Sequence, residues 1–297
     1  MDKKSIPTFF VLGVQKSATS FIHSLLYQDK RISLPYRKET HFFSMNFDKK
    51  IQWYLDMFQS KKYDIRGEVD PSYIYYPGSL MNIKKLNKSP KFIIIFRNPL
   101  DRAYSHYLMS KKRNYEKLSF SQALLEEEKR ILNDCNYFSF LNHSYMLRGN
   151  YYEQILRCKE IFPNSKYLFI KFDDLINKNR INILKDIYKF LNIDFNHKIN
   201  FNAYKNITTS NKSELLSYLL YNDSKIINII KKIIPSYYFR FKITEFVEKF
   251  NANKKLNITK ENDYSSLDRK FIDWHNKQTS LLKKETDLFL DDWMINE

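Results

Sequence analysis

One segment near the start of the chain constrains its fold more than any other: an apolar run that ends in glycine, followed by a polar loop and a helical pattern. The run Phe9–Gly13 reads Phe-Phe-Val-Leu-Gly, which is typical of a strand buried on both faces. The loop Val14–Ser20 follows, and Phe21, Leu25 and Leu26 then recur at helical spacing. We therefore predict a strand, a loop and a helix whose first backbone N–H groups form an anion-binding site.

The same layout recurs downstream and predicts a parallel sheet. A second apolar run, Phe92–Phe96, precedes a helical pattern over Leu100–Met109, and Pro99 suits the first turn of that helix. A third candidate strand, Tyr167–Lys171, follows a predicted helix over Tyr151–Ile161. Strands that alternate with helices form parallel sheets, so we predict an α/β fold with a parallel sheet flanked by helices.

The rest of the chain predicts helical additions to one domain. Phe120–Asp134 and Ile181–Leu191 have the pattern of amphipathic packing helices. No internal repeat and no linker rich in Pro or Gly divides the chain, so we expect a single domain over residues 1–297. The region 205–260 is basic and apolar, and we expect it to pack on that domain as a helical and loop region or to lie on an acidic membrane.

Composition and charge narrow the class of protein. A hydrophobic share of 43%, with 16% aromatic residues, excludes an intrinsically disordered chain. Fifty basic residues against 33 acidic ones give a net charge of +17, which favours a polyanionic partner: a nucleotide, an anionic glycan, a nucleic acid or an acidic membrane. Two cysteines cannot form a disulfide framework, and no apolar stretch approaches the ~20 residues that span a bilayer. We expect a cytoplasmic protein, with peripheral contact at the inner membrane face as an alternative.

The candidate chemistry begins in the loop after the first strand. Gly13–Ser20 combines a helix start with Lys16 and three hydroxyls, which together form a cradle for a phosphate-like anion. Further on, Arg97 leaves a predicted strand and Ser105 lies two turns into the next helix, so both can face one ligand at the sheet edge. Arginine is well suited to a dianionic phosphate.

A third motif, Lys38-Glu39-Thr40-His41-Phe42-Phe43, supplies acid–base chemistry. A carboxylate and an imidazole two residues apart form a plausible acid–base pair. Its occurrence together with the two anion-binding elements distinguishes it from an ordinary surface turn.

In this order and spacing, the motifs resemble those of sulfotransferases, in particular the glycan branch typified by heparan sulfate sulfotransferases. The segments that carry the likeness are Gly13–Ser20, Lys38–Phe43, Gly67–Tyr73, Phe96–Ser105, Gly149–Tyr151, Phe162–Pro163 and Leu290–Trp293. They span nearly the whole chain. The resemblance implies a modified P-loop fold and transfer of a sulfuryl group from 3′-phosphoadenosine 5′-phosphosulfate to an acceptor, with no metal required.

The resemblance also implies roles for individual residues. The donor-binding residues are Lys16, Ser17, Ala18, Thr19 and Ser20 in the phosphosulfate loop, Arg97 and Ser105 at the 3′-phosphate, and Lys212 in a loop that covers the donor. Glu39 matches the catalytic base, His41 supports it, and Lys16 stabilises the leaving phosphate. Tyr73 and Arg148 line the cleft or serve the structure.

Two positions depart from the pattern. Ala18 replaces the usual glycine, and because its methyl group disfavours positive φ we expect ordinary helical geometry there. Ser44 stands where several heparan sulfate enzymes carry an aspartate that helps the base, so help for Glu39 must come from His41 or elsewhere.

The residues leave other functions open. A nucleic-acid-binding protein fits the charge and the many aromatics, although the sequence has no motif that reads DNA or RNA. A P-loop nucleotide kinase has a related loop, but the second glycine and a metal-holding aspartate are missing. The resemblance and the charge favour a carbohydrate hydroxyl, on a polysaccharide or glycolipid, as the acceptor, with no nucleic acid as partner; small phenols and protein tyrosines remain alternatives.

Overall fold

The computed structural model describes residues 6–58, 63, 65–134, 137–177, 179–202, 209–213, 216, 232–234, 237–255, 264 and 267–295. The chain divides into two compact units. We call them the sheet unit (Met1–Arg102, Leu147–Asn206 and Arg269–Glu297) and the helical unit (Ala103–Met146 and Ile207–Asp268). A single domain with the region 205–260 packed on it stays a prediction.

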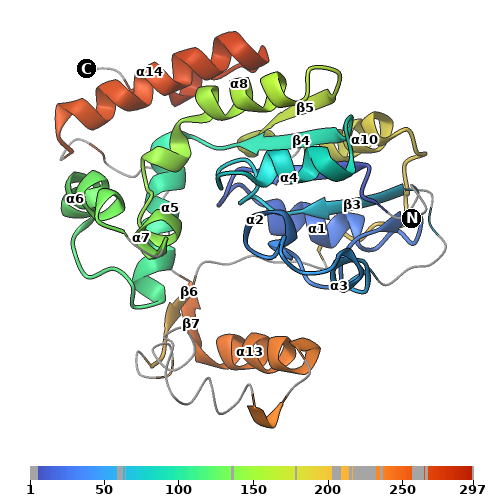
Figure 1. Cartoon of the computed structure of the whole chain (residues 1–297). Coiled ribbons are helices and arrows are strands. Elements are labelled where there is room, and N and C mark those ends of the chain that lie inside the picture. Colours follow the sequence, from blue (N-terminus) through green and yellow to red (C-terminus); the bar gives the residue numbers. More distant parts are fainter. Residues whose placement is uncertain are drawn as a thin grey trace. The chain divides into compact units, whose positions relative to one another are not determined.

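The sheet unit contains the predicted parallel sheet, in the order β2-β3-β1-β4-β5 (Figure 1). Its strands are β1 (Phe9–Gly13), β2 (Ile32–Ser33), β3 (Ile65–Val69), β4 (Lys91–Phe96) and β5 (Lys166–Lys171). Every neighbouring pair is parallel. The three strands predicted from apolar runs are confirmed within one residue at each end.

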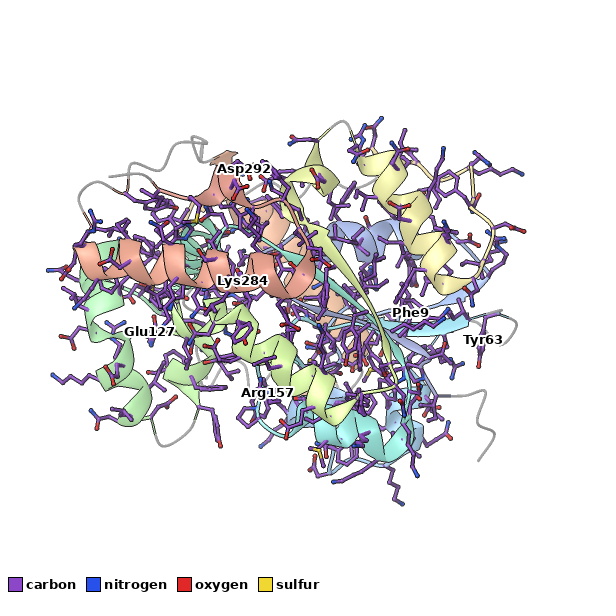
Figure 2. The ribbon with its side chains drawn as sticks, turned by 90° about the horizontal axis from the view of Figure 1, so that it is seen from above. Phe9, Tyr63, Glu127, Arg157, Lys284 and Asp292 are labelled. Atoms are coloured by element: carbon purple, nitrogen blue, oxygen red, sulfur yellow. The ribbon has the colours of Figure 1, made fainter. Side chains whose placement is uncertain are left out.

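Helices surround this sheet. Those of the sheet unit are α1 (Thr19–Leu26), α2 (Phe42–Met45), α3 (Ile51–Leu55), α4 (Ser79–Leu86), α8 (Tyr151–Ile161), α9 (Phe172–Ile176), α10 (Arg180–Leu191) and α14 (Arg269–Thr286), with short 3₁₀ turns η2 (Leu147–Gly149) and η3 (Asp291–Trp293). The helix α5 (Pro99–Lys112) begins in this unit. Figure 2 shows α8, which carries Arg157, beside α14, which carries Lys284.

The strands are buried on both faces, which explains their continuous apolar runs. On one face, Val11 of β1 packs in a core with Leu25 of α1 and Ile187 of α10. On the other face, Phe10 lies edge-on to Phe43, with 5.6 Å between ring centroids. All five residues of β1 are therefore enclosed by side chains.

Strand β3 was not predicted, because Arg66 and Glu68 interrupt its apolar pattern. Both side chains are nevertheless buried. Gly67 between them faces the ring of Phe9 in the neighbouring strand, and a Cβ at this position would lie 2.2 Å from ring carbons. Glycine is thus required for β3 to pair with β1 at this point.

The helical unit contains the remainder of α5 and several further elements. These are α6 (Phe120–Leu132), α7 (Phe138–Asn142), β6 (Thr209–Asn211), α13 (Tyr237–Asn251) and β7 (Ala252–Lys255). Ser119 and Gln122 form a capping box at the start of α6, which matches the predicted helix Phe120–Asp134. The antiparallel pair β6–β7 was not predicted. Most of the isoleucine-rich segment 226–234 lies outside the described residues.

Candidate functional site

Four loops of the candidate site follow four parallel strands. Lys16 comes after β1, Glu39 after β2, Asp70 after β3 and Arg97 after β4. Because the strands are parallel, their carboxyl ends meet at one edge of the sheet. This edge is where ligands bind in open α/β sheets.

The loop between β1 and α1 has a left-handed backbone at two residues that are not glycine. Lys16 has φ 72° and Ala18 has φ 58°. The prediction of ordinary helical geometry at Ala18 is therefore wrong, although the methyl group makes this conformation cost about 1–2 kcal/mol. Hydrogen bonds fix the turn in spite of that cost: the Ser17 N–H donates to Val14 O at 3.2 Å and the Phe21 N–H to Ala18 O at 2.9 Å.

This loop presents polar groups that suit an anionic ligand. Ser17 is fully buried, and its hydroxyl has no hydrogen-bond partner among the described residues. No side chain caps the start of α1, where Thr19 is buried and Ser20 is half-buried. Because buried hydroxyls and helix starts are normally satisfied, the loop fits an anion such as a phosphosulfate.

Arg97 lies against this loop, as its predicted role requires. Its Nη1 donates to the backbone oxygen of Lys16 at 3.0 Å, and its guanidinium lies 4.7 Å from the centroid of the Phe172 ring. The Arg97 carbonyl accepts from the Tyr151 hydroxyl at 2.9 Å. The buried Nε of Arg97 has no hydrogen-bond partner among the described residues. An anion beside the loop would find a donor there.

Ser105 and Lys212 belong to the helical unit, so their pairing with the phosphate loop stays a prediction. Ser105 is buried on α5. Lys212 is exposed, with Nζ 5.4 Å from the centroid of the Phe250 ring, and its backbone N–H donates to Asn251 O at 2.8 Å.

The predicted base, Glu39, lies in a second strained loop. Its φ is 62°, its N–H donates to Val69 O at 3.3 Å, and its carboxylate forms an ion pair with Lys38. The side chain is 34% exposed. Burial and Asp70 raise the pKa of Glu39, but the charges of Lys38 and His41 outweigh them and hold it below its ordinary value. Glu39 is therefore ionised at neutral pH, as a general base must be.

His41, the predicted supporting residue, pairs with the carboxylate of the residue that follows β3. Its Nδ1 lies 3.0 Å from Oδ2 of the fully buried Asp70. Burial lowers the pKa of His41, but Asp70 outweighs this effect and raises it above its ordinary value. Burial likewise raises the pKa of Asp70, and His41 outweighs it and lowers that pKa. The contact therefore favours the protonated imidazole beside the ionised carboxylate.

A second buried carboxylate, that of Glu68 in β3, holds the residue between Glu39 and His41. Glu68 accepts hydrogen bonds from Tyr54 OH at 2.6 Å, from Tyr73 OH at 2.9 Å, and from the hydroxyl and N–H of Thr40. Burial and the neighbouring Asp70 raise the pKa of Glu68 to about 7.

These contacts bear on two residues whose roles were open. Tyr73 is fully buried and bonded to Glu68, which favours its structural alternative. Arg148 is buried with its guanidinium 4.2 Å from the centroid of the Tyr75 ring, and burial lowers its pKa to about 10. Sequence reasoning gave no role to Glu68 or Asp70. The sequence feature that could have found them is a pair of carboxylates two positions apart at the end of one strand.

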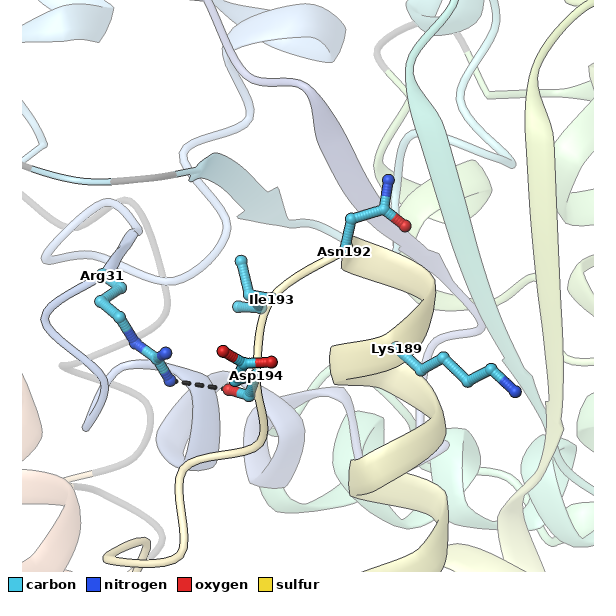
Figure 3. A pocket seen from close by; sticks show the side chains of 5 residues that line it. All are labelled: Arg31, Lys189, Asn192, Ile193 and Asp194. Atoms are coloured by element: carbon cyan, nitrogen blue, oxygen red, sulfur yellow. Dashed lines mark hydrogen bonds between the residues drawn. The ribbon is translucent and has the colours of Figure 1, made fainter.

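A cavity in another part of the sheet unit has no predicted site residue in its lining. Arg31, Lys189, Asn192, Ile193 and Asp194 line it (Figure 3). Arg31 Nη2 spans it to donate to Asp194 O at 2.8 Å. We assign it no role.

Comparisons with known proteins identify the family. The model of a family described as "Sulfotransferase domain" matches residues 7–257. The chain is 28% identical over 139 residues (44% of the chain, 30% of the relative) to membrane-associated sulfotransferase kil1 of Dictyostelium discoideum. It is 25% identical over 178 residues (59% of the chain, 43% of the relative) to human heparan sulfate glucosamine 3-O-sulfotransferase 3B1. The chain thus spans less than half the length of either relative.

A solved structure shares the fold. The sulfotransferase from Alicyclobacillus acidocaldarius superimposes with a TM-score of 0.64, covering 97% of this chain and 98% of that one, at 20% identity.

We expect Glu68 to make the stability of the fold decrease as pH rises through neutrality. Its pKa of about 7 lies above the ordinary 4.5, so between these values the folded protein binds a proton that the unfolded chain has lost. The resulting stabilisation, about 3 kcal/mol, is complete below pH 4.5 and is lost as pH rises through 7. Urea unfolding at pH 5 and pH 8 should show a larger decrease for the wild type than for Glu68→Gln. Equal decreases would contradict the raised pKa.

Proposed function

The chain belongs to the sulfotransferase domain family, and we propose that it transfers a sulfuryl group from 3′-phosphoadenosine 5′-phosphosulfate to an acceptor hydroxyl. The observation that carries this proposal is the hydrogen bond between Arg97 and the backbone of Lys16, at the sheet edge that also bears the Glu39 loop. The buried Ser17 hydroxyl and the start of α1 suit the phosphosulfate. The Nε of Arg97 suits the second phosphate.

The proposed reaction is an in-line displacement at sulfur. Glu39 takes the proton of the acceptor hydroxyl while its oxygen bonds to sulfur, and the bond from sulfur to the phosphate oxygen breaks. Lys16 stabilises the charge that develops on the departing phosphate. Lys38 and His41 lower the pKa of Glu39 and so keep it ionised and able to accept the proton.

For the acceptor we propose a hydroxyl on a carbohydrate, either a polysaccharide or a glycolipid. Two observations support this choice: the human relative is named a heparan sulfate glucosamine 3-O-sulfotransferase, and the net charge of +17 suits an anionic glycan.

We further propose a cytoplasmic location with peripheral contact to an acidic membrane through α13. Exposed apolar side chains recur on one face of this helix: Phe239, Ile243, Phe246 and Phe250. Their spacing of four, three and four residues places them in one stripe, and the exposed Lys242 flanks it. The Dictyostelium relative is named membrane-associated. No helix among the described residues is both long and apolar enough to cross a bilayer.

Calorimetric titration with the product 3′-phosphoadenosine 5′-phosphate tests the donor site. We expect saturable binding by the wild type, and binding weakened about tenfold or more in Arg97→Ala, because a charge-assisted hydrogen bond contributes about 1.5–3 kcal/mol. Lys16→Ala should chiefly reduce turnover. Lys88→Ala, an exposed lysine on the sheet unit, is the control for net charge. Unchanged affinity in Arg97→Ala would refute its assignment.

The same titration separates the alternative functions. Binding of arbitrary oligonucleotides with steep salt dependence, in place of the adenosine bisphosphate, would favour a nucleic-acid-binding protein. Phosphoryl transfer that depends on magnesium would favour a nucleotide kinase.

Incubation of the donor with a glycan panel, followed by mass detection of added sulfate, tests the base. Glu39→Gln should bind the adenosine bisphosphate like the wild type and transfer sulfate roughly 10²-fold more slowly, since loss of a general base has this magnitude. Normal binding with full-speed transfer would remove Glu39 from the mechanism and leave His41 as the candidate.

Co-sedimentation with lipid vesicles tests the membrane contact. We expect binding to vesicles that contain phosphatidylserine, and at least tenfold weaker binding when Phe246 (70% exposed) and Phe250 (67% exposed) are both changed to Ser. Phe289→Ser is the matched control, because this side chain is 68% exposed but lies outside α13. Equal affinities of the double variant and the control would argue against α13 as the contact.

A further inference from the structure

We infer that Asp70 is a positioning residue for the proposed reaction, because from the end of β3 it fixes both the backbone and the imidazole ring of His41 beside Glu39. The inference rests on the proposed function for its catalytic meaning. Its structural part concerns only residues of the sheet unit.

The contacts of Asp70 determine the orientation of His41. One carboxylate oxygen, Oδ2, lies 3.0 Å from the ring Nδ1 of His41 and accepts its backbone N–H, also at 3.0 Å. The other oxygen, Oδ1, accepts the Ser72 N–H at 2.9 Å. The hydrogen bond fixes the backbone of His41, and the ion-pair contact places the ring Nδ1 beside the same carboxylate oxygen. The ring Nε2 therefore points away from Asp70.

The loop that carries the base depends on such anchors. Glu39 and His41 both have positive φ, at 62° and 53°, and the side chain of the N-cap residue His41 does not cap α2; the Thr40 hydroxyl accepts the Phe42 N–H at 3.1 Å instead. Residues in this conformation are maintained only when the surroundings hold them. Thr40 is bonded to Glu68 of β3 and His41 to Asp70, the residue after β3, so two carboxyl groups two positions apart hold consecutive residues of the loop.

Asp70 also supplies charge to the site. The charged groups that face Asp70 or His41 are Arg37, Lys38, Glu39, Glu68 and Arg148. Asp70 and Glu39 raise the pKa of His41, whereas burial and Arg37 lower it. Removal of the Asp70 charge should therefore make His41 lose its proton at lower pH. Its effect on Glu39 is mixed, because Asp70 repels that carboxylate directly but also keeps His41 charged. The His41 ring is thus the informative reporter.

The test is an NMR titration of the imidazole rings in the full chain. The chain has six histidines, and the signal of His41 is identified as the one that is lost in His41→Gln. We expect the His41 midpoint of the wild type to lie above 6.5, and to fall in Asp70→Asn. Glu68→Gln, which removes a neighbouring buried carboxylate that does not contact His41, is the matched control and should leave the midpoint in place. An unchanged midpoint in folded Asp70→Asn overturns the inference.

If Asp70→Asn fails to fold, the wild type alone still tests the inference, since a His41 midpoint below 6.5 would show that Asp70 does not stabilise the charged imidazole.

A positioning role has a kinetic signature as well. If His41 must be protonated, the alkaline limb of the kcat profile moves to lower pH in Asp70→Asn. Transfer on that limb then slows by up to about tenfold for each pH unit that the limb moves. The affinity for the adenosine bisphosphate should not change.

These readouts separate the two claims. Failure of the wild type to bind the adenosine bisphosphate defeats the proposed function, while the titration still reports on the His41–Asp70 pair. Normal binding and transfer, with identical pH profiles for wild type and Asp70→Asn, defeats the positioning role alone.

Discussion

Burying Glu68 and Asp70 away from water would be costly unless each carboxylate had strong partners. The partners are the consecutive residues Thr40 and His41, together with two tyrosine hydroxyls and a backbone N–H. The need to satisfy two buried carboxyl groups therefore fixes the loop that carries Glu39. The strained backbone of that loop and the position of the imidazole depend on this one constraint.

The parallel sheet determines where these groups meet. Parallel strands place their carboxyl ends at one edge, so Lys16 after β1 and Arg97 after β4 become neighbours although they lie 81 positions apart in the sequence. Close packing supports this arrangement. Gly67 of β3 has no side chain and so leaves room for the ring of Phe9, its partner in β1. Both faces of β1 are covered. The overall charge of +17 matters less for specificity than the few cations that this edge places beside the loop.

The strain in the site follows the same logic. Lys16, Ala18, Glu39 and His41 all have positive φ, and each lies in a loop that follows a buried strand. Hydrogen bonds compensate for the local cost: the Val14 carbonyl accepts from Ser17 within the first loop, and the Val69 carbonyl of β3 accepts from Glu39 in the second. Strained residues of this kind cluster at functional sites, where a fixed geometry is worth its cost in stability.

The local sequence pattern was enough to predict β1, β4 and β5, the helices that follow β1 and β4, and Lys16 and Arg97 as loop residues, because apolar periodicity and strand ends are properties of short segments. The local pattern failed for β3, because a strand with a buried glutamate does not show the apolar pattern of a buried strand. It also failed for Ala18, whose backbone is left-handed. Asp70 and its pairing with His41 were beyond it as well. Those features arise from hydrogen bonds and charge pairs between segments that are distant in the sequence, and only the folded chain decides which of them form.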